Sequence, residues 1–200
     1  MNSFLEYLKE NPDCLYIYNR DFSIYGLPSK ERYTIIVKDG FILPEEFDDE
    51  YINNYSKYEF FFLKEWFEQI LNGKLIGWEC ACLNKKYIIK EHVKLLMTTN
   101  PLQLRKDADS FKKEMELFGE PVDLKVYFEL IKTIKFSIQI IENHKIVNYK
   151  DALNDYNLIK NSESLEERHQ IINKSYEILR SLTNGAIKQE ILKKTNVEEL

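Results

Sequence analysis

The spacing of apolar residues along the chain changes near residue 101. Before this point, short apolar runs alternate with turn residues, a pattern that predicts strands and short helices. After it, apolar residues recur every three or four positions over long stretches, as they do on amphipathic helices. We therefore predict an α+β fold, in which residues 1–100 form an α/β core around a small mixed β-sheet and residues 101–200 form a helical domain packed on it.

Two runs in the first half have strand character. Residues 14–18 (CLYIY) are aromatic and β-branched, and residues 32–38 (RYTIIVK) alternate so that Tyr33, Ile35 and Val37 share one face. Because the second run is apolar on both faces, we expect it to be a central strand that is covered on both sides.

The other segments of the first half are predicted mainly as helices. Residues 57–72 have apolar positions at helical spacings and end at Gly73, although the first of them (YEFFFL) also favour a strand. The remaining predictions for this half are helices over residues 3–10 and 90–97 and a short apolar segment over residues 78–83.

The second half has its clearest apolar stripe over residues 124–143, behind Asp123 as a predicted N-cap. Asn184-Gly185 is predicted to end a helix, since Gly is the preferred residue just after a helix C-terminus. The predicted helices are residues 102–118, 124–143, 149–160, 165–183 and 187–194.

Charge and composition limit the classes of function. The chain has 28 basic and 33 acidic residues, a formal net charge of -5, which disfavours a non-specific nucleic-acid binder because such proteins need a basic surface. The amino terminus lacks the apolar stretch of a signal peptide and no apolar run approaches the length of a membrane span, so we expect a cytoplasmic protein. The many Lys, Asn, Ile and Tyr residues are typical of an AT-rich genome, such as that of a phage, whose product would act in the host cytoplasm.

Two clusters of metal-ligating residue types have simpler interpretations. Cys80-x-Cys82 together with His92 lacks the two-residue gap and the fourth ligand of a structural zinc site, so the cysteines are better explained as reduced thiols on one buried face. The acidic run over residues 45–50 could bind a divalent cation, but a solvated loop or helix start is the commoner origin of such a run.

The order of motifs in the first half resembles a bacterial and phage branch of the nucleotidyltransferase (DNA polymerase beta-like) superfamily. That branch has Gly-Ser-x-x-Tyr-Gly-Leu, then Ser-Asp-x-Asp on the next strand, an apolar run ending in Pro, a Leu-Lys-x-Phe helix with a Gly near its end, and a helical second half. The corresponding residues here are Tyr25-Gly26-Leu27, Phe41-Ile42-Leu43-Pro44, Leu63-Lys64 with Phe67, and Gly73.

The chain departs from that pattern at the residues that carry the chemistry. Counted from Gly26, the two metal-binding aspartates of the family correspond to Tyr33 and Ile35, and the Gly-Ser that cradles the triphosphate corresponds to Asp21-Phe22. The family's third carboxylate lies on the strand before the Leu-Lys helix, and its nearest counterpart here is Lys57, with Glu59 two residues on.

Two-metal nucleotidyl transfer needs carboxylates to hold the cations, and neither a neutral phenol nor an aliphatic side chain replaces them. The leading hypothesis is therefore a pseudoenzyme without a cofactor, which binds a protein partner or a small ligand in the former cleft, for example as a phage modulator of a host factor; nucleotide is another candidate ligand. The candidate cleft residues are Asp21, Phe22, Tyr25, Gly26, Arg32, Tyr33, Ile35 and Glu59.

Two alternatives stay open. The chain could be an active, Mg²⁺-dependent nucleotidyltransferase that has moved its metal ligands to Asp21, Glu31, Asp39 or Glu59, although these do not pair at i, i+2 on one strand. It could also be a helical interaction module whose basic pairs contact phosphates, although acidic residues are interspersed among them. These pairs are Arg105-Lys106, Lys112-Lys113 and Lys193-Lys194.

Overall fold

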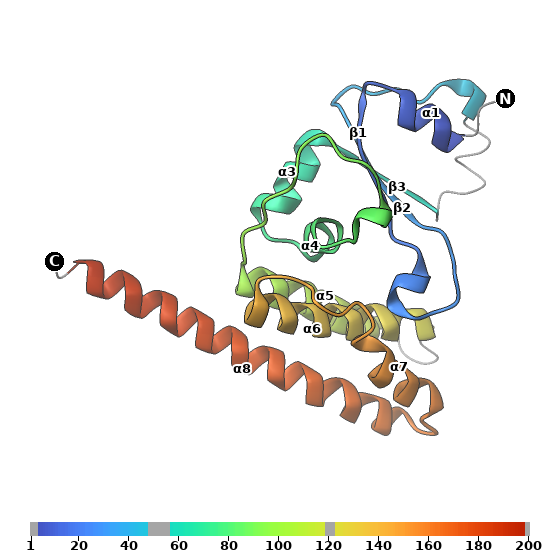
Figure 1. Ribbon diagram of the computed structural model, residues 1–200. Helices are drawn as coiled ribbons and strands as arrows, with labels where there is room; N and C mark the ends of the chain where they lie inside the picture. The colour runs from blue at the N-terminus through green and yellow to red at the C-terminus, as the bar shows by residue number, and fades with distance from the viewer. Residues whose placement is uncertain (1–3, 48–56, 119–122, 199–200) are drawn as a thin grey trace. The chain divides into compact units, whose positions relative to one another are not determined.

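The computed structural model describes residues 4–47, 57–118 and 123–198, and it has the α+β architecture that the sequence predicts, with a helical second half (Figure 1). The chain divides into two compact units, one comprising residues 1–72 and 76–98 and the other residues 73–75 and 99–200. The acidic positions 48–50 of the sequence analysis lie outside the described residues.

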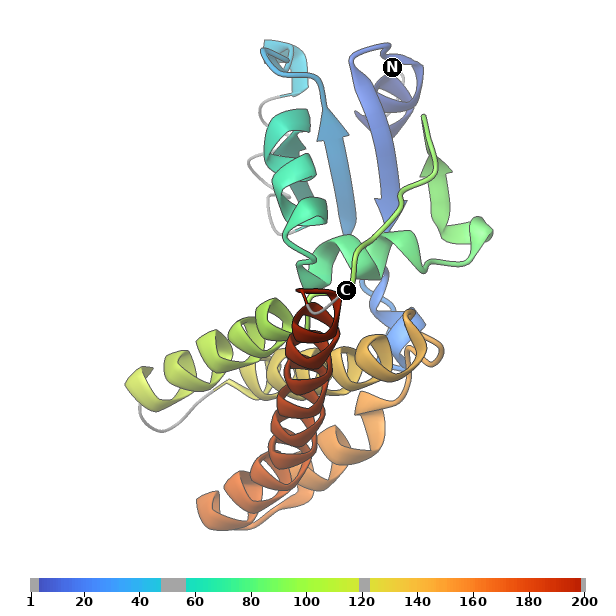
Figure 2. The same cartoon turned by 90° about the vertical axis from the view of Figure 1, so that its left-hand side faces the viewer.

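The first unit is built around a four-stranded mixed sheet with the strand order β3-β2-β1-β4. β1 is antiparallel to β2 and to β4, whereas β2 and β3 are parallel. Figure 2 shows the arrow of β1 reversed relative to those of β2 and β4. The strands are β1 (Cys14–Asn19), β2 (Tyr33–Val37), β3 (Tyr58–Phe62) and β4 (Ile88–Lys90).

Helices of the first unit cover both faces of the sheet, in agreement with the apolar pattern of β2, all five of whose residues are buried. On one face, α1 contributes Phe4 and Leu8 to a core cluster that includes Ile35. On the other face, the ring of Trp66 in α3 lies 6.3 Å from the ring of Tyr18. The helices of this unit are α1 (Phe4–Glu10), α3 (Leu63–Leu71) and α4 (Leu75–Ala81), with short 3-10 turns η1 (Phe22–Tyr25), η2 (Glu45–Phe47) and η3 (Lys85–Tyr87).

The described residues of the second unit form helices joined by short turns, without a strand, and the unit centres on α6 (Leu124–Asn143). The predicted N-cap is confirmed, because the Asp123 carboxylate accepts a 2.9 Å hydrogen bond from the Lys125 backbone N–H. Buried Gln139 fixes the turn after α6: its side-chain oxygen accepts from the backbone N–H groups of Val147 (2.9 Å) and Asn148 (2.8 Å). The other helices are α5 (Pro101–Phe118), α7 (Ala152–Asn161) and α8 (Leu165–Glu198).

Two local predictions were wrong. Residues 90–97 are not a helix, because Lys90 instead closes β4 and donates its ammonium to the backbone oxygens of Lys9 and Asn11. The apolar segment over residues 78–83, whose conformation the sequence left open, lies largely in helix α4. Helix α8 continues through Asn184-Gly185, because that Gly does not adopt the left-handed conformation that ends a helix and costs only about 1 kcal/mol inside one.

Residues 57–72, for which the sequence allowed a helix or an initial strand, contain a strand followed by a helix. β3 occupies Tyr58–Phe62 and α3 begins at Leu63. Parallel pairing with β2, which sets Tyr33 beside Tyr58 and Val37 beside Phe62, holds the aromatic run extended.

Candidate functional site

A buried arginine lies at the centre of the polar residues of the first unit. Arg20 directly follows β1, and its two terminal guanidinium nitrogens donate to Glu59 Oε2, on β3, and to Glu79 Oε2, on α4, the latter at 3.0 Å. Both Arg20 and Glu79 are only 3% exposed. One side chain therefore pairs with two carboxylates that come from positions far apart in the sequence.

Two further side chains extend this cluster. The Tyr25 hydroxyl donates to Glu79 Oε2 at 3.0 Å, and Arg32 Nη2 lies 3.4 Å from Glu59 Oε2. We call Arg20, Tyr25, Arg32, Glu59 and Glu79 the arginine cluster. It joins the ends of three strands to η1 and α4, and its two arginines balance its two glutamates.

Electrostatics favour the charged form of the central arginine. Burial alone would lower the pKa of Arg20, but Glu79 above all, with smaller contributions from Tyr25 and Glu59, raises that pKa above its usual value. A buried charge is tolerated only when it is paired and hydrogen-bonded, so the cluster is stable as a unit and would be destabilised by the loss of one partner.

The loop that corresponds to the triphosphate cradle is fixed by its own hydrogen bonds. Asp21 accepts from the Ser23 backbone N–H at 2.7 Å and from the Ser29 hydroxyl at 2.8 Å. Burial would raise the pKa of Asp21, but these hydrogen bonds lower it. Gly26 ends η1 with a φ of 84°, a left-handed conformation that favours glycine. Asp21 is thus an N-cap, and Phe22 contacts the ring of Tyr25.

Tyr33, which the sequence analysis aligned with the first metal-binding aspartate of the family, belongs to a second group of polar side chains, on the opposite face of the sheet from Thr34. The Tyr33 hydroxyl donates to Glu31 Oε1 at 3.1 Å, and Lys57 Nζ lies 2.6 Å from Glu31 Oε2 and 5.6 Å from the centre of the Tyr33 ring. Burial, and then Glu31, raises the pKa of Tyr33 to about 12, whereas the hydrogen bond from Lys57 lowers the pKa of Glu31. Tyr33 and Lys57, which the sequence analysis aligned with two carboxylates of the resembled family, lie side by side as a neutral phenol and a cation.

Ile35, which the sequence analysis aligned with the second metal-binding aspartate, is completely buried in the core cluster with Phe4 and Leu8 of α1. It pairs across the parallel strands with Phe60. This part of β2 is sealed by packed apolar side chains.

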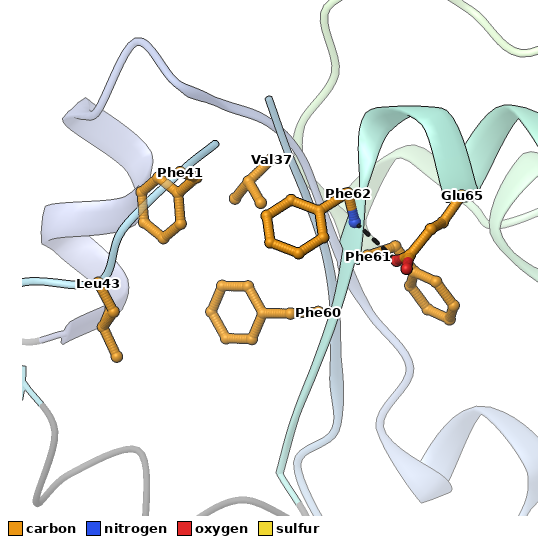
Figure 3. Close-up of a pocket in the computed structure, with 7 residues that line it drawn as sticks. All are labelled: Val37, Phe41, Leu43, Phe60, Phe61, Phe62 and Glu65. Atoms are coloured by element: carbon orange, nitrogen blue, oxygen red, sulfur yellow. Dashed lines mark hydrogen bonds between the residues drawn. The ribbon is translucent and has the colours of Figure 1, made fainter. Parts of the chain in front are cut away.

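The same face of the sheet has a pocket at its other end, which the sequence analysis did not predict. β2 ends at Val37 and β3 at Phe62, and because the strands are parallel these carboxyl ends lie at one edge of the sheet. Figure 3 shows the side chains of Phe41, Phe60 and Phe62 gathered around the same space. The pocket has a volume of about 200 Å³ and is lined by Val37, Phe41, Leu43, Phe60, Phe61, Phe62 and Glu65.

Of the candidate cleft residues, the structure brings Tyr25, Arg32 and Glu59 into one cluster. It separates them from Tyr33 and Ile35, which face the α1 side of the sheet. Arg20 and Glu79 are not among the residues predicted from the sequence; the available signal was the charged Glu79 between the apolar Trp78 and Cys80, a position that requires a buried partner.

The four carboxylates of the relocated-ligand alternative all accept hydrogen bonds from protein groups. Asp21 caps η1, Glu31 pairs with Lys57, and Glu59 pairs with Arg20. Asp39 Oδ1 accepts from the Lys64 backbone N–H at 3.3 Å, near the start of α3. Among the residues that the structure describes, no group of three or more His, Cys, Asp or Glu side chains could hold a metal ion.

The cysteines are free thiols. Cys80 is buried in α4, Cys82 is half-buried just beyond the end of that helix, and His92 is exposed. No helix among the described residues combines the length and apolar character that crossing a membrane requires.

Comparison with known proteins adds no relative: no protein-family model, curated protein or solved structure matches the chain.

Proposed function

We propose that the chain is a catalytically inactive nucleotidyltransferase-like protein that acts by binding a protein partner or a small ligand. The proposal combines the resemblance of the sequence motifs with the chemistry of the side chains at the corresponding positions. The three free cysteines fit a reducing compartment, so the proposal includes the cytoplasm as the place of action.

The observation that carries the proposal is the contact between Tyr33 and Lys57. In a two-metal active site, the corresponding side chains would be carboxylates that hold a divalent cation between them. Here the cation is the chain's own ammonium group, which lies 2.6 Å from Glu31 and 5.6 Å from the centre of the Tyr33 ring. A divalent cation at this place would be repelled by Lys57 and would find only one carboxylate.

The neighbouring residues of β2 also lack carboxylates. β2 has the sequence YTIIV, so a shift of one residue would move the two metal positions to Thr34 and Ile36, which are not carboxylates either. Thr34 pairs with Glu59, the single acidic residue of β3, and that carboxylate is already neutralised by Arg20. On either face of the sheet, a protein cation interacts with the acidic side chain.

Binding is the activity that the surface favours. On the face of β2 and β3 that would hold metal and nucleotide, Ile35 is buried under α1, and the accessible part is the apolar pocket beside Val37 and Phe62. Apolar pockets with few polar groups are typical binding sites.

The experiment is a transfer assay with the full chain, radiolabelled nucleoside triphosphates, a mixture of protein and RNA acceptors, and either Mg²⁺ or Mn²⁺. We expect no metal-dependent incorporation of label. The control variant is Glu68→Ala, because the Glu68 carboxylate is exposed on α3. Incorporation of label that is retained in Glu68→Ala but lost in Asp21→Ala or Glu59→Ala would show an active enzyme with relocated ligands and would refute the proposal.

A further inference from the structure

The pocket at the carboxyl ends of β2 and β3 has an apolar rim as well as an apolar lining. Ile42 lies between the lining residues Phe41 and Leu43 in the sequence and is 84% exposed, and Phe62 is 42% exposed. Large apolar side chains with this exposure next to an apolar hollow are typical of protein interaction sites.

The charged residue in the lining is Glu65, and the two segments that supply the lining are predominantly acidic. The segments that line it, residues 37–46 and 60–68, carry five acidic residues and two lysines. One of the lysines, Lys38, is already paired, because its ammonium lies 2.8 Å from Asp13. The acidic residues, all exposed, are Asp39, Glu45, Glu46, Glu65 and Glu68.

We propose that this pocket binds a basic segment of a partner protein by accepting one of its aromatic side chains, while lysine or arginine residues on either side of that ring face the acidic rim. The pocket has room for a single ring, and the rings of Phe41, Phe60 and Phe62 offer it aromatic contacts. The surrounding carboxylates select against acidic segments through electrostatic complementarity. This inference rests on the proposed binding function, for which it names the site and the partner chemistry.

The test uses three acetylated, amidated pentapeptides, KKFKK, KKAKK and EEFEE, titrated into the full chain with ¹³C-labelled methyl groups. The chemical shifts of the Val37, Ile42 and Leu43 methyl groups report on binding at the pocket. We expect saturable shifts with KKFKK, and binding at least about 10-fold weaker for each of the other two peptides at low salt. Raising NaCl from about 20 mM to about 500 mM is expected to weaken KKFKK binding, since exposed charges are screened.

Two variants locate the site without disturbing the core. Ile42→Ser removes an exposed rim side chain, and Leu96→Ser is its matched control, because Leu96 is 85% exposed elsewhere in the same unit. Phe62→Ser is a second test, because Phe62 is the N-cap of α3 and Ser is a favoured N-cap residue. We expect weaker KKFKK binding in Ile42→Ser and Phe62→Ser and unchanged binding in Leu96→Ser.

Three results would overturn the proposal. Equal binding of EEFEE would mean that the acidic rim does not select the partner, and equal binding of KKAKK would mean that the pocket does not take the ring. Absence of methyl shifts with KKFKK up to millimolar concentration would exclude the pocket. The proposed loss of catalysis is tested separately by nucleotide transfer, so either proposal can fail while the other stands.

Discussion

Replacement of Arg20 by methionine is expected to destabilise the first unit more than any change at an exposed ion pair. Methionine fills a similar volume but leaves Glu79, 3% exposed, without the 3.0 Å hydrogen bond from the guanidinium. Removing one partner of a buried ion pair typically costs about 3–5 kcal/mol. Tyr25 still donates to Glu79, and Arg32 still faces Glu59, so we expect a loss near the lower end, about 3 kcal/mol.

Urea unfolding followed by tryptophan fluorescence measures this loss. The two tryptophans of the chain, Trp66 and Trp78, both lie in the first unit, so the signal reports on the unit that contains the arginine cluster. The matched control is Lys38→Met, which breaks a 2.8 Å pair with Asp13 that is half-exposed at both ends and should cost less than about 1 kcal/mol.

A double variant separates charge from packing. Adding Glu79→Gln to Arg20→Met removes the uncompensated charge, so the double variant should be more stable than Arg20→Met alone. The reasoning is refuted if Arg20→Met loses no more free energy of unfolding than Lys38→Met, or if Glu79→Gln destabilises the Arg20→Met protein further.

Three further predictions concern the turns and the thiols. Gln139→Leu removes the acceptor of two backbone N–H groups and should cost about 2–4 kcal/mol in the free energy of unfolding of the second unit, measured by circular dichroism. Gly26→Ala, at a φ of 84°, should lower the free energy of unfolding by about 1–2 kcal/mol. Gly185→Ala, inside α8 with open space around it, should raise the free energy of unfolding by about 0.5–1 kcal/mol. The opposite order of the two variants in thermal unfolding would contradict the assigned conformations. Burial raises the pKa of the Cys14 thiol to about 11 and that of Cys80 to about 12, so neither should react with a thiol reagent in the native protein at pH 8. Labelling of either thiol in the native protein at the rate of the unfolded chain would contradict this protection. Above the ordinary thiol pKa of about 8.5, the unfolded chain releases thiol protons that the folded protein retains. The free energy of unfolding should therefore fall as the pH rises from that value towards 11.

The elements that the sequence predicted correctly are those whose pattern reflects local burial. β2 has apolar residues on both of its faces, as a covered central strand does. α6 has a continuous stripe of apolar residues behind an Asp N-cap. The spacing of apolar residues, together with the N-cap of α6, is enough to identify both elements. The run YEFFFL was ambiguous because its aromatic residues favour a strand, whereas its apolar positions also fit the helical spacing of residues 57–72; parallel pairing with β2 decides for the strand.

The arginine cluster could not be predicted in the same way. Arg20 and Glu79 are 59 residues apart, and their contact exists only because α4 packs on the sheet beside the end of β1. The pocket likewise depends on the segment after β2, where Phe41 and Leu43 turn back over β3. Such sites arise from tertiary packing, so sequence spacing does not reveal them.

The loss of the metal ligands is tested most directly by Mn²⁺ binding, measured by electron paramagnetic resonance of the wild-type chain. On the described strands β2 and β3, a neutral Tyr33 beside the Lys57 ammonium, and a Glu59 that is paired with Arg20, leave no pair of carboxylates for a cation. We therefore expect the signal of free Mn²⁺ to stay undiminished at micromolar metal and protein concentrations. Stoichiometric binding of Mn²⁺ that disappears in Glu59→Ala, but persists in Glu68→Ala, would contradict the inactive assignment.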